Sequence, residues 1–288
     1  MRDINKDTIT QAVLERHQDT ANERLKTIFD GLVTHLHDFA REVELTEDEW
    51  NHAIEFLTEV GQTCSKNRQE FILLSDVLGL SMLLVAQNQA KPESCTEATV
   101  FGPFHVEDPP AYELGDDVSN GLEGPPWFIH GHIVDNNGEP VPNAEIEVWQ
   151  ADERGYYDVQ MGSNPEMAGR GVLHADDQGH YHFQSVVPAC YPIPDDGPIG
   201  RMLEALGRHP WRPAHLHFMI TADGCEQLVT HVFRKDGNYL DSDAVFGVRP
   251  SLIADWLEHE AGSTTPEGQT FDEPFYTLKF DFVLNRKS

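Results

Sequence analysis

The apolar residues of this chain change their spacing part-way along, and that change limits the folds it can adopt. Up to about residue 95 they recur at the three-to-four-residue period of a helix. From Trp127 onward they alternate with polar residues, as in a half-buried strand. The spacing therefore predicts an α+β chain with a helical N-terminal region over 1–95, followed by an antiparallel β-sandwich or barrel over 96–288.

Three segments of the first region carry helical patterns. Residues 24–43 repeat apolar side chains at helical spacing, and Thr46 followed by Glu49 is a capping box that predicts a second helix, ending near Gly61. The run Phe71–Ala86 is the most apolar of the chain. Its 16 residues fall short of the roughly 20 that a membrane-spanning helix needs. We expect it to be one core helix.

The second region predicts short strands separated by Gly and Pro turns. A connection rich in proline, glycine and acidic residues comes first, over 88–126. The period of two then predicts strands over 127–134, 144–150, 179–187, 215–221, 228–233 and 275–284. Residues 251–259 are expected to form one isolated helix.

The charge balance and the cysteines restrict partners and location. The chain has 49 Asp and Glu against 20 Lys and Arg, a formal net charge of −29. Such a surface repels nucleic acids and anionic membranes, and we expect neither as a partner. Cys64, Cys95, Cys190 and Cys225 are scattered, and the N-terminus carries no signal-peptide pattern. Free thiols and a cytoplasmic location are therefore expected.

Three His-x-His triplets fall on predicted strands, where residues two apart point to the same side. They are His130-Gly131-His132, His180-Tyr181-His182 and His215-Leu216-His217. Each could offer two imidazoles to a metal ion, although surface or cross-strand pairing would also explain any one of them. The third is favoured because it runs into the apolar segment 218–220 and closely follows Arg212.

Tyrosines precede this triplet and add hard oxygen donors. Tyr156 and Tyr157 follow Gly155, and Tyr191 lies in a Pro-Ala-Cys-Tyr-Pro segment. A phenolate suits Fe(III) better than Zn(II), and tyrosine ligates iron in some haem proteins. On this evidence alone they could equally be turn tyrosines that cover an edge of the sandwich.

The order of these segments resembles the intradiol ring-cleavage dioxygenases over nearly the whole chain. The motifs are Gly155-Tyr156-Tyr157, then Tyr191, then Arg212-Pro213-Ala214-His215-Leu216-His217-Phe218. The resemblance implies one Fe(III) per subunit, bound by Tyr157, Tyr191, His215 and His217, because the family's first tyrosine ligand stands two residues after the glycine. It also implies that Arg212 stabilises negative charge on the substrate and that Tyr191 leaves the iron when substrate binds. The N-terminal helices would form a homodimer, in which some family members hold a lipid; the sequence leaves a lipid here open.

Within the family, residues 96–104, 207–211 and 240–248 are most similar to hydroxyquinol 1,2-dioxygenases, and His231 stands where catechol enzymes carry glutamine. The implied reaction inserts both atoms of O2 between the hydroxyl-bearing carbons of hydroxyquinol, giving 3-hydroxy-cis,cis-muconate, which tautomerises to maleylacetate. Asp76 could accept a hydrogen bond from the third hydroxyl, or be a capped or solvent-reaching acid. The positions implied to contact substrate are Leu73, Asp76, Val100, Phe101, Gly102, Pro103, Ile193, Pro194, Phe218, His231 and Val245.

Three other functions remain open on the sequence. A chlorocatechol or catechol 1,2-dioxygenase would use the same iron and chemistry. A transthyretin-like binding module would need no metal, and a zinc hydrolase would need a carboxylate or cysteine ligand. Colour separates them, because phenolate-to-Fe(III) charge transfer makes a protein red.

Overall fold

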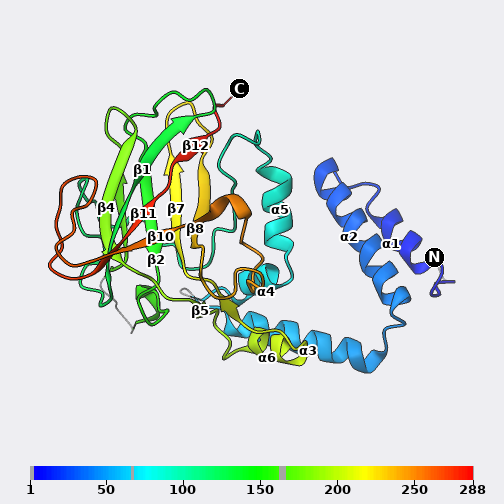
Figure 1. Cartoon of the computed structure of the whole chain (residues 1–288). Coiled ribbons are helices and arrows are strands. Elements are labelled where there is room, and N and C mark those ends of the chain that lie inside the picture. The colour runs from blue at the N-terminus through cyan, green and yellow to red at the C-terminus, as the bar shows by residue number, and fades with distance from the viewer. Residues whose placement is uncertain (1–2, 66–67, 162–166, 288) are drawn as a thin grey trace. The chain divides into compact units, whose positions relative to one another are not determined.

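The computed structural model describes residues 3–65, 68–161 and 167–287, which form two compact units (Figure 1). The first unit runs to Glu59 and the second begins at Val60, so the boundary falls within a helix. The first unit contains α1 (Ile9–Arg16), α2 (Glu23–Glu42) and most of α3 (Glu47–Thr63).

Side-chain caps start the two long helices where the sequence predicts them. Asn22 accepts a hydrogen bond from the Leu25 backbone N–H at 3.0 Å and begins α2. The predicted capping box of α3 is present. The Thr46 N–H donates to the Glu49 carboxylate at 2.9 Å, and the Glu49 N–H donates to the Thr46 hydroxyl at 3.3 Å. The helix passes Gly61 and ends at Thr63.

The segment expected to be one core helix is two helices, α4 (Glu70–Val77) and α5 (Leu80–Asn88). Gly79 separates them with a φ of 74°, a left-handed conformation that stops a helix. The prediction was also wrong about burial, since only part of the pair is enclosed and Phe71, Leu78 and Leu83 are exposed. Among the described residues no single helix is long and apolar enough to cross a membrane; α4 and α5 pass that test only as a pair, bent by 76°.

The second unit is built around two five-stranded sheets. One has the order β10-β11-β1-β12, with β4 also paired to β1, and the other has the order β3-β2-β7-β8-β9. Most pairs are antiparallel, but β1 pairs with β11 and β12, and β8 with β9, in parallel. The strands are β1 (Pro126–Asp135), β2 (Glu145–Gln150), β3 (Arg170–His174), β4 (His180–Val186), β7 (His215–Thr221), β8 (Leu228–Arg234), β9 (Ile253–Ala254), β10 (Trp256–His259), β11 (Phe275–Lys279) and β12 (Phe282–Leu284).

The hydrophobic core lies between the sheets, as the period of two predicts. Ile129 and Ile133 of β1, Ile146 of β2 and Leu216 and Phe218 of β7 are all fully buried in it. The β-sandwich expected from the sequence is thus confirmed. A short pair, β5 (Tyr191–Pro192) with β6 (Trp211–Arg212), and the helix α6 (Pro198–Ala205) were not anticipated; they come between β4 and β7 in the chain.

The helix expected over 251–259 is wrong. Only Pro250–Leu252 forms a short 3₁₀ turn, and the residues after it form β9 and β10. Trp256 pairs with Leu278 of β11 and its ring lies 4.4 Å from that of Trp127. Sheet pairing and aromatic packing therefore override the local helical pattern.

The strand expected over 275–284 is interrupted. Gly131 of β1 explains the break, because a Cβ at this glycine would lie 1.8 Å from the carbonyl oxygen of Phe280. Before it β1 pairs with β11, and after it with β12. Asp281 crosses the gap by accepting a hydrogen bond from the His132 N–H at 2.9 Å. The glycine of this His-x-His triplet thus has a structural role.

Candidate active site

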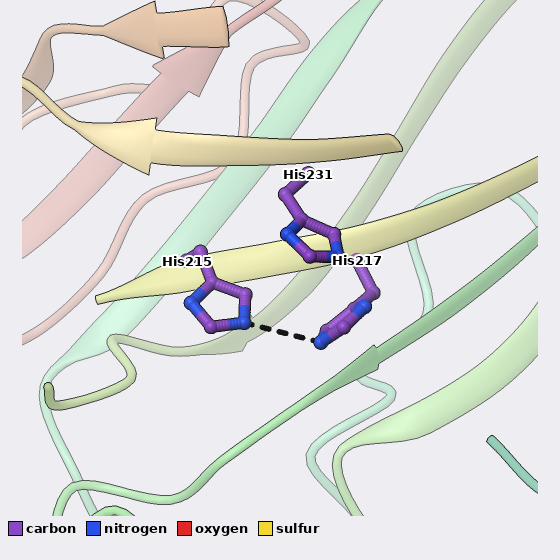
Figure 2. A group of neighbouring side chains, drawn as sticks. All are labelled: His215, His217 and His231. Carbon is purple, nitrogen blue, oxygen red and sulfur yellow. Dashed lines mark hydrogen bonds between the residues drawn. The ribbon is translucent and has the colours of Figure 1, made fainter. Parts of the chain in front are cut away.

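Three buried histidines lie on the face of β7 and β8 that points away from the sandwich core. His215 and His217 alternate with the core residues of β7, and His231 of β8 pairs directly with His217. Their rings converge in Figure 2, and their nitrogen donor atoms lie within 4.8 Å of one another. All three side chains are at most 2% exposed.

The phenol oxygen of Tyr157 lies beside two of these rings. The Nε2 atoms of His215 and His217 are 3.1 Å apart, and Tyr157 Oη lies 3.0 Å from the second and 3.5 Å from the first. His215 Nδ1 donates to the Pro213 carbonyl at 2.7 Å, which leaves its Nε2 lone pair facing this group. Donors about 2.0–2.1 Å from one ion lie about 3 Å apart, so the three atoms fit the coordination sphere of a metal ion.

The turn after β2 selects Tyr157 over its neighbour. Gly155 has a φ of 86°, and a Cβ there would meet Tyr191 Cβ at 2.6 Å, so only glycine allows the two segments to approach this closely. Tyr156 is 55% exposed, whereas Tyr157 is fully buried and stacks on Phe104 with ring centroids 4.4 Å apart. The structure therefore turns the second tyrosine inward, as the resemblance implies.

Tyr191 and Arg212 are brought together by the β5–β6 pair, in which they are directly opposite. Arg212 Nη1 lies 3.4 Å from Tyr191 Oη and 3.3 Å from His215 Nε2. Its Nε donates to Asp243 Oδ1 at 3.0 Å, and both side chains of this ion pair are buried. A fixed positive charge is thus held beside the phenol and imidazole donors.

Burial controls the protonation of the histidines. It lowers the pKa of His215 to about 3, with Arg212 adding to the effect, and places the pKa of His217 and His231 well below the ordinary value. All three rings are therefore neutral near pH 7, the form that binds metals.

Burial also affects the pKa values of Tyr157, Arg212 and Asp243. It raises the pKa of Tyr157 well above that of a free phenol, which a bound cation would reverse. Burial opposes the charge on Arg212, but Asp243 and the two tyrosines outweigh it and raise the guanidinium pKa. Burial also opposes the charge on Asp243, whose pKa is nevertheless lowered by Arg212.

Several of the residues predicted to contact substrate lie around this cluster. A Cβ on Gly102 would come 3.3 Å from His217 Cε1, and the ring of Phe101 packs 5.8 Å from Trp149, which itself stacks on His217. Asp76 is buried, which raises the pKa of its carboxyl; Arg212 lowers this pKa and Asp243 raises it further.

The remaining predicted positions form two groups. The first group lies on segments that carry site residues. Ile193 and Pro194 follow Tyr191, Val245 follows Asp243, Val100 and Pro103 flank residues 101–102, and Leu73 lies one turn before Asp76. The second group is Phe218 alone, which the structure does not bring to the site. It points to the opposite face of β7 and packs in the core with its ring 4.7 Å from that of Phe282.

Sequence reasoning missed two supports of the site. Asp243 anchors Arg212, but the segment 240–248 carries two acids, Asp241 and Asp243, and nothing in its pattern singles out the second. Arg170 and Asp158 form a buried ion pair next to Tyr157, with Arg170 Nε 2.6 Å from Asp158 Oδ2. Nothing in the spacing of these two residues indicates that they meet.

The comparisons with known proteins agree with this geometry. The family description "Dioxygenase" matches residues 102–286, and "Catechol dioxygenase N terminus" matches residues 22–96. The chain is 56% identical to a 6-chlorohydroxyquinol 1,2-dioxygenase of Cupriavidus pinatubonensis, over 99% of each chain. The chain belongs to the intradiol dioxygenase family. It is an enzyme of the class that cleaves aromatic diols with O2 and uses iron.

Other members of the intradiol dioxygenase family support the same assignment. A hydroxyquinol 1,2-dioxygenase of Corynebacterium glutamicum is 49% identical over 96% of this chain and 93% of its own. The crystal structure of a hydroxyquinol 1,2-dioxygenase from Pseudomonas putida matches with a TM-score of 0.91 at 44% identity, covering 98% of this chain and 99% of that one. Membership removes the non-catalytic binding module and the zinc hydrolase as alternatives.

Proposed function

We propose that this intradiol dioxygenase acts on hydroxyquinol, benzene-1,2,4-triol, and inserts both atoms of O2 between its two adjacent hydroxyl-bearing carbons. The product is 3-hydroxy-cis,cis-muconate, which tautomerises to maleylacetate. The observation that carries the proposal is the convergence of Tyr157 Oη with the Nε2 atoms of His215 and His217, beside Arg212. The names of relatives at 56% and 49% identity support the triol over catechol.

The metal of this proposal is one Fe(III) per subunit, held by Tyr157, Tyr191, His215 and His217. The donor set fits, because two neutral imidazoles and two phenol oxygens supply hard anionic and borderline ligands in a buried site. Bound there, ferric iron supplies Lewis acidity that makes the ring carbons of a bound diolate reactive towards O2.

The protein residues handle protons and charge. With ferric iron bound, Tyr191 would be a phenolate, whose Oη would accept a proton from the incoming diol. Arg212 Nη1, 3.4 Å from that oxygen, would stabilise the negative charge left on the substrate. Asp243 keeps the guanidinium in place on the other side. His231 Nδ1, 3.3 Å from Arg212 Nη2, completes the positioning of Arg212.

The third hydroxyl of the triol distinguishes it from catechol, and we assign its recognition to Asp76. This carboxylate is buried on α4, where an acid without partners is costly. Burial raises its pKa, and Ser81 hydrogen-bonds it. The other pocket positions are Leu73, Val100, Phe101, Gly102, Pro103, Ile193, Pro194, His231 and Val245. Catechol and chlorocatechols remain the alternative substrates.

The N-terminal helices are proposed to form a homodimer interface, with a lipid as an optional occupant, and the enzyme to work in the cytoplasm. No residue of α2 is buried, and apolar side chains such as Leu32, Leu36 and Phe39 are more than half exposed. Such a stripe is typical of a surface that another chain covers. We place the division between helical and catalytic regions at residues 95 and 96, close to the limits of the two family matches.

A visible spectrum of the purified enzyme tests the proposal. A red band from tyrosinate-to-Fe(III) charge transfer is expected, and it should shift on anaerobic addition of hydroxyquinol at lower concentration than of catechol. Oxygen uptake in air then gives kcat/KM for each diol. A protein that stays colourless after ferric iron is supplied would refute the ligand set, and a kcat/KM that favours catechol would refute the triol as preferred substrate.

A further inference from the structure

Four histidines line the outer face of the other sheet, on the strands β1 and β4. These strands are antiparallel, with His130 opposite His182 and His132 opposite His180. Their strand neighbours Ile129 and Tyr181 point into the core, so all four imidazoles share the outward face. They belong to the two His-x-His triplets that the intradiol site does not use.

A turn from the connection between β10 and β11 adds a carboxylate to this face. Gly268 has a φ of 86° and donates its N–H to the Thr265 carbonyl at 3.0 Å, and Gln269 N–H donates to the Thr265 hydroxyl at 3.1 Å. The turn holds Glu267 so that its Oε1 lies 3.1 Å from His180 Nε2. Both of these side chains are 20% exposed.

The donor atoms of His130, His180 and Glu267 all lie within 4.8 Å of one another. The second carboxylate oxygen, Glu267 Oε2, is shielded from solvent and has no hydrogen-bond partner among the described residues, and the same is true of His182 Nδ1. A buried acceptor atom that receives no hydrogen bond destabilises the folded protein. A cation beside the carboxylate would satisfy it.

We propose that His130, His180 and Glu267 form a second metal site, which binds a divalent ion of the zinc type. Two imidazole nitrogens and one carboxylate oxygen are the ligands that Zn²⁺ accepts, with water in the fourth position, whereas Mg²⁺ prefers oxygen ligands alone. Binding would bring the donors from their present separations of up to 4.8 Å to the roughly 3.3 Å spacing of a tetrahedral ion with bonds of about 2.0 Å. The ion would tie the turn 264–270 to the sheet.

The site is independent of the proposed reaction, and the test uses the iron-loaded full-length enzyme. Isothermal titration calorimetry with ZnCl₂ is expected to show one zinc ion per chain that Glu267→Gln weakens at least tenfold and His180→Gln weakens similarly. The matched control is His174→Gln, which removes an exposed histidine of β3 that lies 3.7 Å from Glu145. This variant should bind zinc like the wild type, and excess Mg²⁺ should not compete.

Iron content and hydroxyquinol turnover are measured before and after each titration. Unchanged iron content, with zinc bound, assigns the isotherm to the outer site. The proposal is overturned if wild type and Glu267→Gln give the same isotherm, if His174→Gln weakens binding as much, or if zinc binds only as iron is lost. Folding of each variant is checked by circular dichroism, and the two substitutions, on a turn and on a strand, give independent readings.

Discussion

The buried pair between Arg212 and Asp243 gives the sharpest prediction. Asp243→Asn keeps the shape of the side chain and removes its charge. The wild-type carboxylate accepts from Arg212 Nε at 3.0 Å and from the Gly247 N–H at 2.8 Å, and both charged side chains are at most 3% exposed. Removing one partner of a buried pair costs about 3–5 kcal/mol. Because asparagine keeps one acceptor, we expect a loss of about 3 kcal/mol in the free energy of unfolding.

The same substitution should lower the rate. Fixed electrostatic groups at a reacting centre contribute about 2.7–4 kcal/mol, and a guanidinium that is present but no longer anchored loses part of that. We expect kcat for hydroxyquinol to fall by about 10- to 100-fold, or about 1.4–2.8 kcal/mol, with a smaller change in KM. Urea unfolding measures the stability, and oxygen uptake measures kcat and KM.

The matched control is Asp135→Asn, which removes the carboxylate of an ion pair with Arg286 at the end of β1, in the other sheet. It should lower stability and leave kcat unchanged. If Asp243→Asn lowers stability but keeps kcat within twofold of the wild type, Asp243 does not position Arg212 for catalysis, and the reasoning is wrong. Rescue of kcat by Asp243→Glu would support it.

Three further outcomes are expected. Tyr157→Phe should lower the iron content of the purified enzyme and shift its visible band, as metal analysis and absorption will show. Gly102→Ala should cost about 1–2 kcal/mol and reduce kcat, because its φ of 79° disfavours a side chain and the new Cβ would press on His217; unchanged urea unfolding and turnover would contradict this. Arg286 lowers the pKa of Asp135 to about 2, so the stability difference between wild type and Asp135→Asn should be full above about pH 4 and vanish as the pH falls towards 2. A difference in urea midpoints that persists at pH 2 would rule this out.

The sequence patterns predicted a helix or strand well where the burial of one of its faces determines its secondary structure. The strand over 215–221 is found with its expected limits, because Leu216, Phe218 and Ile220, each two residues apart, all face the core. The helix expected over 251–259 failed because its partner, β11, lies later in the chain and no local signal shows the pairing. The break at Phe280 depends on the absence of a side chain at Gly131, about 150 residues earlier, and could not be read from the strand itself.

The residues of the candidate site likewise divide into those that the sequence could predict and those that it could not. Spacing put His215 and His217 on one face, as it did the pairs of the other two triplets, and the apolar segment 218–220 and Arg212 favoured this pair. The choice of Tyr157 over Tyr156 came from the family resemblance. Its physical cause, the close approach of Gly155 to Tyr191, is not visible in the sequence. Phe218 was placed in the pocket only by the family resemblance, although a residue next to His217 on a strand points to the opposite face. Asp243 was missed since its partner Arg212 lies 31 residues away in sequence.

The parallel pairing of β1 with β11 and β12 has a consequence for how the chain folds. The paired strands are separated by most of the sequence of the second unit. The first sheet therefore cannot be completed until the chain is synthesised beyond Leu284. The other sheet, from β2 to β8, needs only residues 145–234 for its main pairings. The face that carries His215, His217 and His231 can therefore form before β10, β11 and β12 are synthesised and complete the cover of the core. Long-range pairing of this kind is slow, and the interval exposes apolar strands to aggregation.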